Sequence, residues 1–138
     1  MAESKKLVLN IIVTANYLSE KLAEIIKPFD ISSQQFNVLR ILRGQRGKPA
    51  NLSTIQERMV SKMSNTTRLV DKLVDKNLCE RIVCPSNRRK VEIRITEQGL
   101  KLLEKLDPLI EDHENNIAEK INEKEILSLN EKLNELRS

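Results

Sequence analysis

The segment from Ser61 to Ile95 changes its hydrophobic period part-way along, and this change constrains the fold more than any other feature of the sequence. Its first half, "SKMSNTTRLVDKLVDKN", carries apolar residues at helical spacing, namely Leu69, Val70, Leu73 and Val74. Its last part, "KVEIRI", alternates strictly between charged and apolar residues, which is typical of a half-buried strand. The β-forming stretch "CERIVC" and the turn-like "PSNRR" lie between them. The sequence therefore predicts a helix followed directly by a two-stranded hairpin.

Upstream of this segment the chain predicts three helices. Residues 5–29 form an apolar stripe wide enough to indicate burial on more than one side, for example by a second chain. Ser32 or Ser33 is expected to cap the second helix. Ser53, followed three residues later by Gln56, is a capping-box pattern for a short third helix. With only 3 Gly and 4 Pro in 138 residues, a mainly helical protein is expected.

Downstream of the predicted hairpin the chain returns to helical patterning. Thr96 is expected to cap a helix that Pro108 kinks or divides. Asn122 and Glu125 resemble a further capping box. The last helix has a narrow apolar stripe suited to a helical partner, formed by Ile126, Leu129, Leu133 and Leu136.

The short third helix and the helix after it outline a helix-turn-helix, whose second helix reads DNA in proteins that bind it. Ser61 is expected to cap this reading helix, with Met63 and Thr66 on its buried side. The residues expected on the opposite, outward face are Ser64, Asn65, Arg68 and Lys72. Such hydroxyl, amide and guanidinium groups can bind base edges in the major groove. An ordinary amphipathic helix with a polar outer face is the alternative interpretation.

Charge is divided unevenly along the chain. Residues 61–95 hold nine Lys and Arg against four Asp and Glu, a net charge of +5, whereas residues 96–138 hold six against eleven, a net charge of −5. The densest cations, Arg88, Arg89 and Lys90, fall at the tip of the predicted hairpin, where no partner in the same fold is expected. Arginine at such a tip can enter a minor groove. A solvated charged face would look similar, but the pattern favours a phosphate-bearing partner.

Other classes of protein find little support in the sequence. No apolar run approaches the roughly 18 residues of a membrane span, so a cytoplasmic protein with no membrane partner is expected. Cys79 and Cys84 would lie roughly 16 Å apart in an extended strand, too far for a disulfide. His113 is the only histidine, and there is no metal-ligand spacing and no glycine-rich phosphate loop. Neither an enzyme nor a metal or cofactor site is expected.

The stretch "TTRLVDKLVDKNLCERIVCPSNRRKVEIRITEQG" resembles the reading helix, wing strands and following helix of the MarR family of winged helix-turn-helix transcription regulators. "RLVDKL" and "ITEQG" are especially close to the family pattern, and the resemblance spans nearly the whole chain. It implies a mainly α fold with a small β-hairpin in a single domain, residues 1–138. The winged helix-turn-helix core would occupy 31–100, and dimerisation helices would occupy 1–30 and 101–138.

The resemblance also implies a function. A homodimeric regulator, often a repressor, would bind a pseudo-palindromic operator in double-stranded DNA. Many relatives release DNA when a small aromatic or anionic ligand binds, so a small-molecule inducer is a further expected partner. Others respond to oxidation of a cysteine near the start of the chain, where this chain has none. A module of the same fold that binds a partner and has lost DNA recognition is the alternative.

Family positions can be carried over to individual residues. Arg89 matches the wing arginine of an Asp-x-Arg motif, but Asn87 replaces its acid, so the wing is expected to be looser or to aim Arg88 instead. Ser64, Asn65, Thr67 and Arg68 match reading-helix positions that face the major groove. The full set expected to bind DNA is Ser64, Asn65, Thr67, Arg68, Lys72, Arg88, Arg89 and Lys90.

Overall fold

A computed structural model describes the backbone of residues 1–138 and every side chain except those of Cys84 and Arg88. The chain forms two compact units, Met1–Leu106 and Asp107–Ser138. The finer division expected from the sequence, into a core at 31–100 and flanking dimerisation helices, stays a prediction.

The fold is mainly helical with one small sheet, as the sequence predicts. The elements of the first unit, in chain order, are α1 (Glu3–Ile26), the 3-10 turn η1 (Lys27–Phe29), α2 (Ser33–Arg43), β1 (Ala50–Asn51), α3 (Leu52–Arg58), α4 (Thr66–Asp75), β2 (Cys79–Cys84) and β3 (Asn87–Ile95). Helix α5 (Glu97–Ala118) begins in the first unit and ends in the second, where α6 (Glu123–Leu136) follows.

The predicted helix caps are partly confirmed. Ser32 caps α2 in a full capping box, because its Oγ accepts from the Gln35 N–H (3.0 Å) and its own N–H donates to Gln35 Oε1 (2.9 Å). The prediction that Ser53 caps α3 is wrong. Asn51 does so, accepting from the Thr54 N–H at 2.8 Å. Helix α3 therefore starts one residue before Ser53, whose hydroxyl donates to the same Asn51 oxygen at 2.9 Å.

Two further caps agree with the sequence pattern, and one predicted break is absent. Thr96 Oγ1 accepts from the Gly99 N–H at 3.1 Å at the start of α5. Asn122 and Glu125 form the predicted capping box of α6. Pro108 lies inside α5 and does not divide it, because a proline removes only the hydrogen bond of its own missing N–H and the turns on either side keep theirs.

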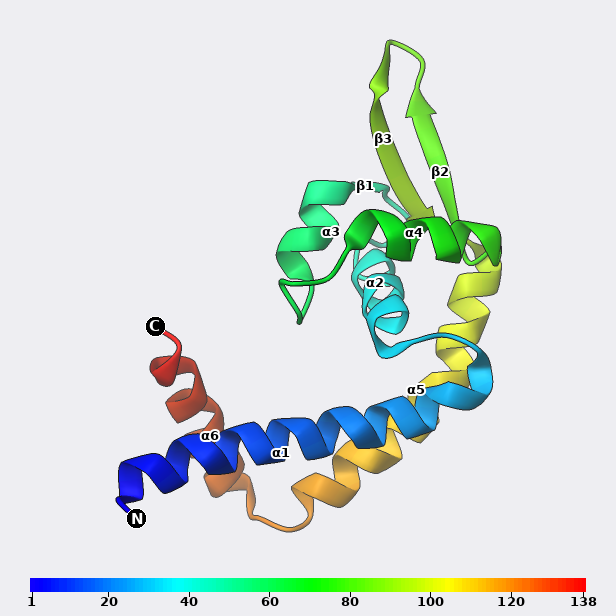
Figure 1. The fold of residues 1–138 in the computed structure, drawn as a ribbon. Coiled ribbons are helices and arrows are strands. Elements are labelled where there is room, and N and C mark those ends of the chain that lie inside the picture. Colours follow the sequence, from blue (N-terminus) through cyan, green and yellow to red (C-terminus); the bar gives the residue numbers. More distant parts are fainter. The chain divides into compact units, whose positions relative to one another are not determined.

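The sheet places the hairpin against the helices. Its strand order is β1-β3-β2, all antiparallel, and the short strand β1 was not anticipated from the sequence. Cys84 pairs with Asn87 across a two-residue turn, and Val83 pairs with Val91, so residues 88–90 bulge from the ladder. Figure 1 shows β2 and β3 leaving the end of α4 as a two-stranded arm with its turn at the free end.

The core of the first unit is aliphatic, as a composition with 2% aromatic residues requires. Ile93 and Ile95 are buried on one face of β3, whereas Lys90 on the other face is exposed, so the predicted alternation holds. Helix α4 packs on α2 and on β2. The other fully buried side chains include Ile26, Val38, Leu39, Leu42, Ile55, Met59, Val70, Leu73, Leu103 and Leu106.

Candidate nucleic-acid interface

The start of α4 differs from the sequence prediction. The cap is Asn65, whose Oδ1 accepts from the Arg68 N–H at 3.1 Å, and not Ser61. Residues 61–64 form a turn instead, in which the Ser64 N–H donates to the Ser61 carbonyl at 3.3 Å. Ser64 is consequently buried, with 8% of its surface exposed, so its expected place on the outward face is wrong. Met63, expected on the buried side, is 94% exposed.

The remaining residues of α4 lie as predicted. Thr66, Leu69, Val70 and Leu73 are buried, which fixes the rotation of the helix about its axis. The exposed side chains on the other face are Asn65, Thr67, Arg68 and Lys72. The outward face of α4 therefore carries one guanidinium, one ammonium, a hydroxyl and an amide.

Gln56, on α3, holds the turn that leads into α4, and no local sequence pattern signals this role. Its Nε2 donates to the Lys62 carbonyl at 3.0 Å, and its Oε1 accepts from the Thr66 hydroxyl. Asn37 of α2 adds a third attachment, because its Oδ1 accepts from the Val60 N–H at 2.8 Å. These bonds fix where α4 begins relative to α2 and α3.

The other end of α4 is joined firmly to the root of the hairpin. Asn77 adopts φ 63°, and the Leu78 N–H donates to the Leu73 carbonyl at 2.9 Å, which closes the helix in a Schellman motif. The Thr96 hydroxyl donates to the Asn77 carbonyl at 2.7 Å. A Cβ at Gly99 would lie 2.4 Å from the Leu78 carbonyl oxygen, so only glycine fits there. Helix α4 and the hairpin are thus held in one fixed relation.

The hairpin tip exposes its cations. Arg89 and Lys90 are exposed, and the Arg89 N–H donates to Asn87 Oδ1 at 3.1 Å. Asn87 therefore orders the backbone beside Arg89 without supplying the charge that an aspartate would. The side chains of Arg88 and Cys84 lie outside the described residues.

The cations of this basic segment fall into two groups. Arg81 pairs with Asp71, Arg94 with Glu80 at 3.8 Å and Lys76 with Asp30 at 3.9 Å, while Lys62 donates to the Glu57 carbonyl. Within the described side chains, a second group makes no ion pair, and its members are Arg68, Lys72, Arg89 and Lys90. This second group occupies the outward face of α4 and the hairpin tip, where a polyanion can reach it.

A hollow of about 330 Å³ lies beside the turn between α3 and α4. Phe36 and Leu22 give it apolar walls, and the Arg40 guanidinium lies 5.5 Å from the centre of the Phe36 ring. Asn37, Met59, Val60 and Ser61 also line it, together with Ser19, Ser33 and Gln34. The hollow therefore borders the same turn that Asn37 and Gln56 hold.

Other chemistries have little to work with. Cys79 is a buried free thiol, and burial raises the pKa of that thiol to about 12, so it stays protonated and unreactive at neutral pH. Among the residues that the structure describes, no group of three or more His, Cys, Asp and Glu is placed to hold a metal ion. Over the same residues, no helix is both long enough and apolar enough to cross a bilayer.

Known proteins share this arrangement. Residues 31–91 match the sequence profile of the MarR family. A MarR transcription factor from Planctomyces limnophilus, known from its crystal structure, is 31% identical, with a TM-score of 0.72, and the match covers 99% of this chain and 98% of that one. The chain belongs to the MarR family. Members of the MarR family are transcription regulators and not enzymes.

Two further MarR-type relatives match the chain over its central part. The uncharacterized HTH-type transcriptional regulator YhbI of Bacillus subtilis is 33% identical over 87 residues, which are 62% of this chain and 55% of YhbI. The HTH-type transcriptional repressor IacR of Pseudomonas putida is 26% identical over 88 residues, which are 64% of this chain and 52% of IacR. The match therefore spans about half the length of both relatives.

Proposed function

We propose that this MarR-family chain is a homodimeric repressor that binds a pseudo-palindromic operator in double-stranded DNA. The observation that carries the proposal is the division of the cations. Those that serve the fold are paired with acids or carbonyls, whereas Arg68, Lys72, Arg89 and Lys90 are exposed on the two elements that a winged helix-turn-helix directs at DNA. Phosphates are the partner that such unpaired cations suit best.

Each element takes a different part in the proposed complex. Arg68 and Thr67, in the first turn of α4, would meet base edges in the major groove, and Asn65 would remain near them while capping the helix. Lys72, one turn further along, would contact phosphate. Arg89 and Lys90 of the wing, with Arg88 beside them in sequence, would lie along the backbone and the minor groove. Ser64 is left out of this set because it is buried.

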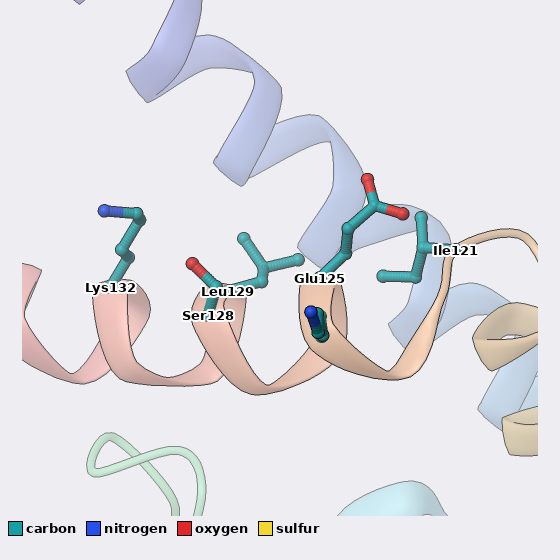
Figure 2. A pocket seen from close by; sticks show the side chains of 6 residues that line it. Ile121, Glu125, Ser128, Leu129 and Lys132 are labelled. Carbon is teal, nitrogen blue, oxygen red and sulfur yellow. The ribbon is translucent and has the colours of Figure 1, made fainter.

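Exposed apolar side chains support the dimer. Helix α1 buries only Ile26 and exposes a run of large apolar residues, namely Leu7, Val8, Leu9, Ile11, Ile12, Val13, Tyr17 and Leu18. The second unit exposes Leu109, Ile121, Leu127, Leu129 and Leu136. Figure 2 shows Ile121 and Leu129 projecting beside Glu125 along α6 into an open hollow of about 490 Å³. Patches of this kind on a single chain mark contact surfaces, and a second copy is the proposed cover.

Selection of bound duplexes from random DNA tests the proposal directly. A repressor of this kind should recover a two-fold related sequence, with half-sites spaced by about one helical turn. Titrations of the selected and a scrambled duplex at several salt concentrations should show specific binding that is about 10³-fold or more tighter. Recovery of no consensus, with equal weak binding to both duplexes, would favour the alternative, a partner-binding module that has lost DNA recognition.

We also propose that the hollow bordered by Phe36 and Arg40 receives a small ring-shaped anion that lowers operator affinity. Its apolar wall would hold the ring, and Arg40 would attract the charge. Benzoate is a suitable probe, because it has both parts and little else. It should weaken operator binding by the wild type and do so much less for Arg40→Gln, whose own operator affinity serves as the control. An equal response of both proteins would contradict this site.

A further inference from the structure

The turn between α3 and α4, residues 59–65, is held in place by side chains at both of its ends. Asn37 accepts from the Val60 N–H at 2.8 Å, and Gln56 bonds both the Lys62 carbonyl, at 3.0 Å, and the Thr66 hydroxyl. A backbone bond of 3.3 Å between residues 64 and 61 closes the turn internally. The direction in which each side chain leaves this turn is therefore set by the fold.

Met63 is the side chain that this turn exposes most. It is 94% exposed, compared with 88% for Val60 on the same turn. The side chains on either side of it are occupied elsewhere, because the Lys62 ammonium donates to the Glu57 carbonyl and Ser64 is buried. An apolar side chain therefore stands two residues before the cap of α4, where a polar residue would be expected in water.

The major groove offers a chemical match for such a side chain. The N-terminal end of a reading helix is the end that meets base edges. The apolar group that base pairs present in that groove is the C5 methyl group of thymine. Methionine suits it, since its thioether is flexible and polarizable and fills irregular apolar gaps.

We propose that Met63 is a specificity-determining residue that reads a thymine methyl group in each half-site. The inference rests on the proposed function, because it requires that α4 enter the major groove of a specific duplex. It adds a base contact from outside the helix, and this contact selects thymine by its methyl group and not by hydrogen bonds.

Replacing thymine by deoxyuridine tests the contact, because the two bases differ only in that methyl group. Each thymine of the selected operator is replaced in turn, at equivalent places in both half-sites, and the duplexes are titrated with the wild type. One position should cost roughly fourfold per methyl group, or roughly fifteenfold for both half-sites, as expected for the apolar contact of one carbon. Met63→Gln, of similar length, should bind the thymine and uracil duplexes equally at that position.

Two matched variants exclude other sources of the effect. Thr67→Ser removes the other methyl group near the start of α4 but keeps its hydroxyl, and Val60→Thr alters the other exposed apolar residue of the turn. Both should retain the full thymine-to-uracil difference. Wild-type protein that binds the operator but ignores every uracil, or a difference that persists in Met63→Gln or disappears in Thr67→Ser or Val60→Thr, overturns the inference alone. Failure to bind any selected duplex specifically overturns the proposed function.

Discussion

Asn65 has two separable roles in this structure, and substituting it should change stability and DNA binding in opposite directions. Its Oδ1 caps α4 through the Arg68 N–H at 3.1 Å, while the residue itself is exposed at the end of the helix proposed to enter the groove. Asn65→Ala removes the cap and should cost about 1 kcal/mol of unfolding free energy. For a chain of 138 residues this corresponds to roughly 3–5 °C in Tm.

Asn65→Asp keeps the cap and adds a negative charge at the positive end of the helix dipole. The folded protein should be unchanged or up to about 0.5 kcal/mol more stable. Binding to DNA should nevertheless weaken. A like charge roughly 8 Å from one phosphate costs about 0.5 kcal/mol even at the dielectric constant of water. With several phosphates near each of two half-sites, the loss should be on the order of tenfold at low salt and should shrink as salt is added.

Urea unfolding and operator titrations at several salt concentrations measure the two effects separately. Asn65→Ser is the matched control, because serine caps helices about as well as asparagine and adds no charge. Its stability and its salt dependence should both stay close to those of the wild type. If Asn65→Asp bound the operator as tightly as the wild type at low salt, α4 would not approach DNA by its N-terminal end, and the proposed docking would be wrong.

Three further predictions concern the wing, the dimer and the core. An Arg88→Ala/Arg89→Ala variant should weaken binding to operator and scrambled duplexes alike and flatten the salt slope by about one unit for each phosphate that the variant no longer touches, whereas Arg68→Ala should cost about 1–3 kcal/mol mainly on the operator. Truncation before Asn122 should abolish the dimer in sedimentation, and a soluble truncated dimer would contradict the proposed interface. Because burial raises the Cys79 pKa to about 12, the folded state keeps a proton that an unfolded thiol loses near pH 8.5, so stability should fall as pH rises from about 9 towards 12. Cys79→Ala should lessen that fall, and the native thiol should react slowly with alkylating reagents at neutral pH.

The polar caps show how far local pattern reaches and where it stops. The Ser32 and Asn122 boxes were predictable because donor and acceptor lie within one helical turn. At α3 and α4 several residues could serve as the cap, and local pattern favoured Ser53 and Ser61. The structure places Asn51 and Asn65 there. In α4, contacts from Gln56 to residues six and ten positions away in the chain fix the preceding turn, and no local pattern contains them.

The sequence by itself determined the order of the elements, the inward face of α4 and the strand alternation of the wing, because these depend on hydrophobic periods that a short stretch of chain carries. It also identified Arg68, Lys72, Arg89 and Lys90 as candidates, because their charge is a property of the residue. Only the tertiary structure decided which cations are free of acidic partners, that Ser64 is buried and that Met63 is exposed. Those outcomes depend on groups distant in the chain, such as Asp71 for Arg81 and Asn37 for the turn beside Met63. Burial and pairing are properties of the assembled fold, so the surface offered to DNA could be read only after packing was known.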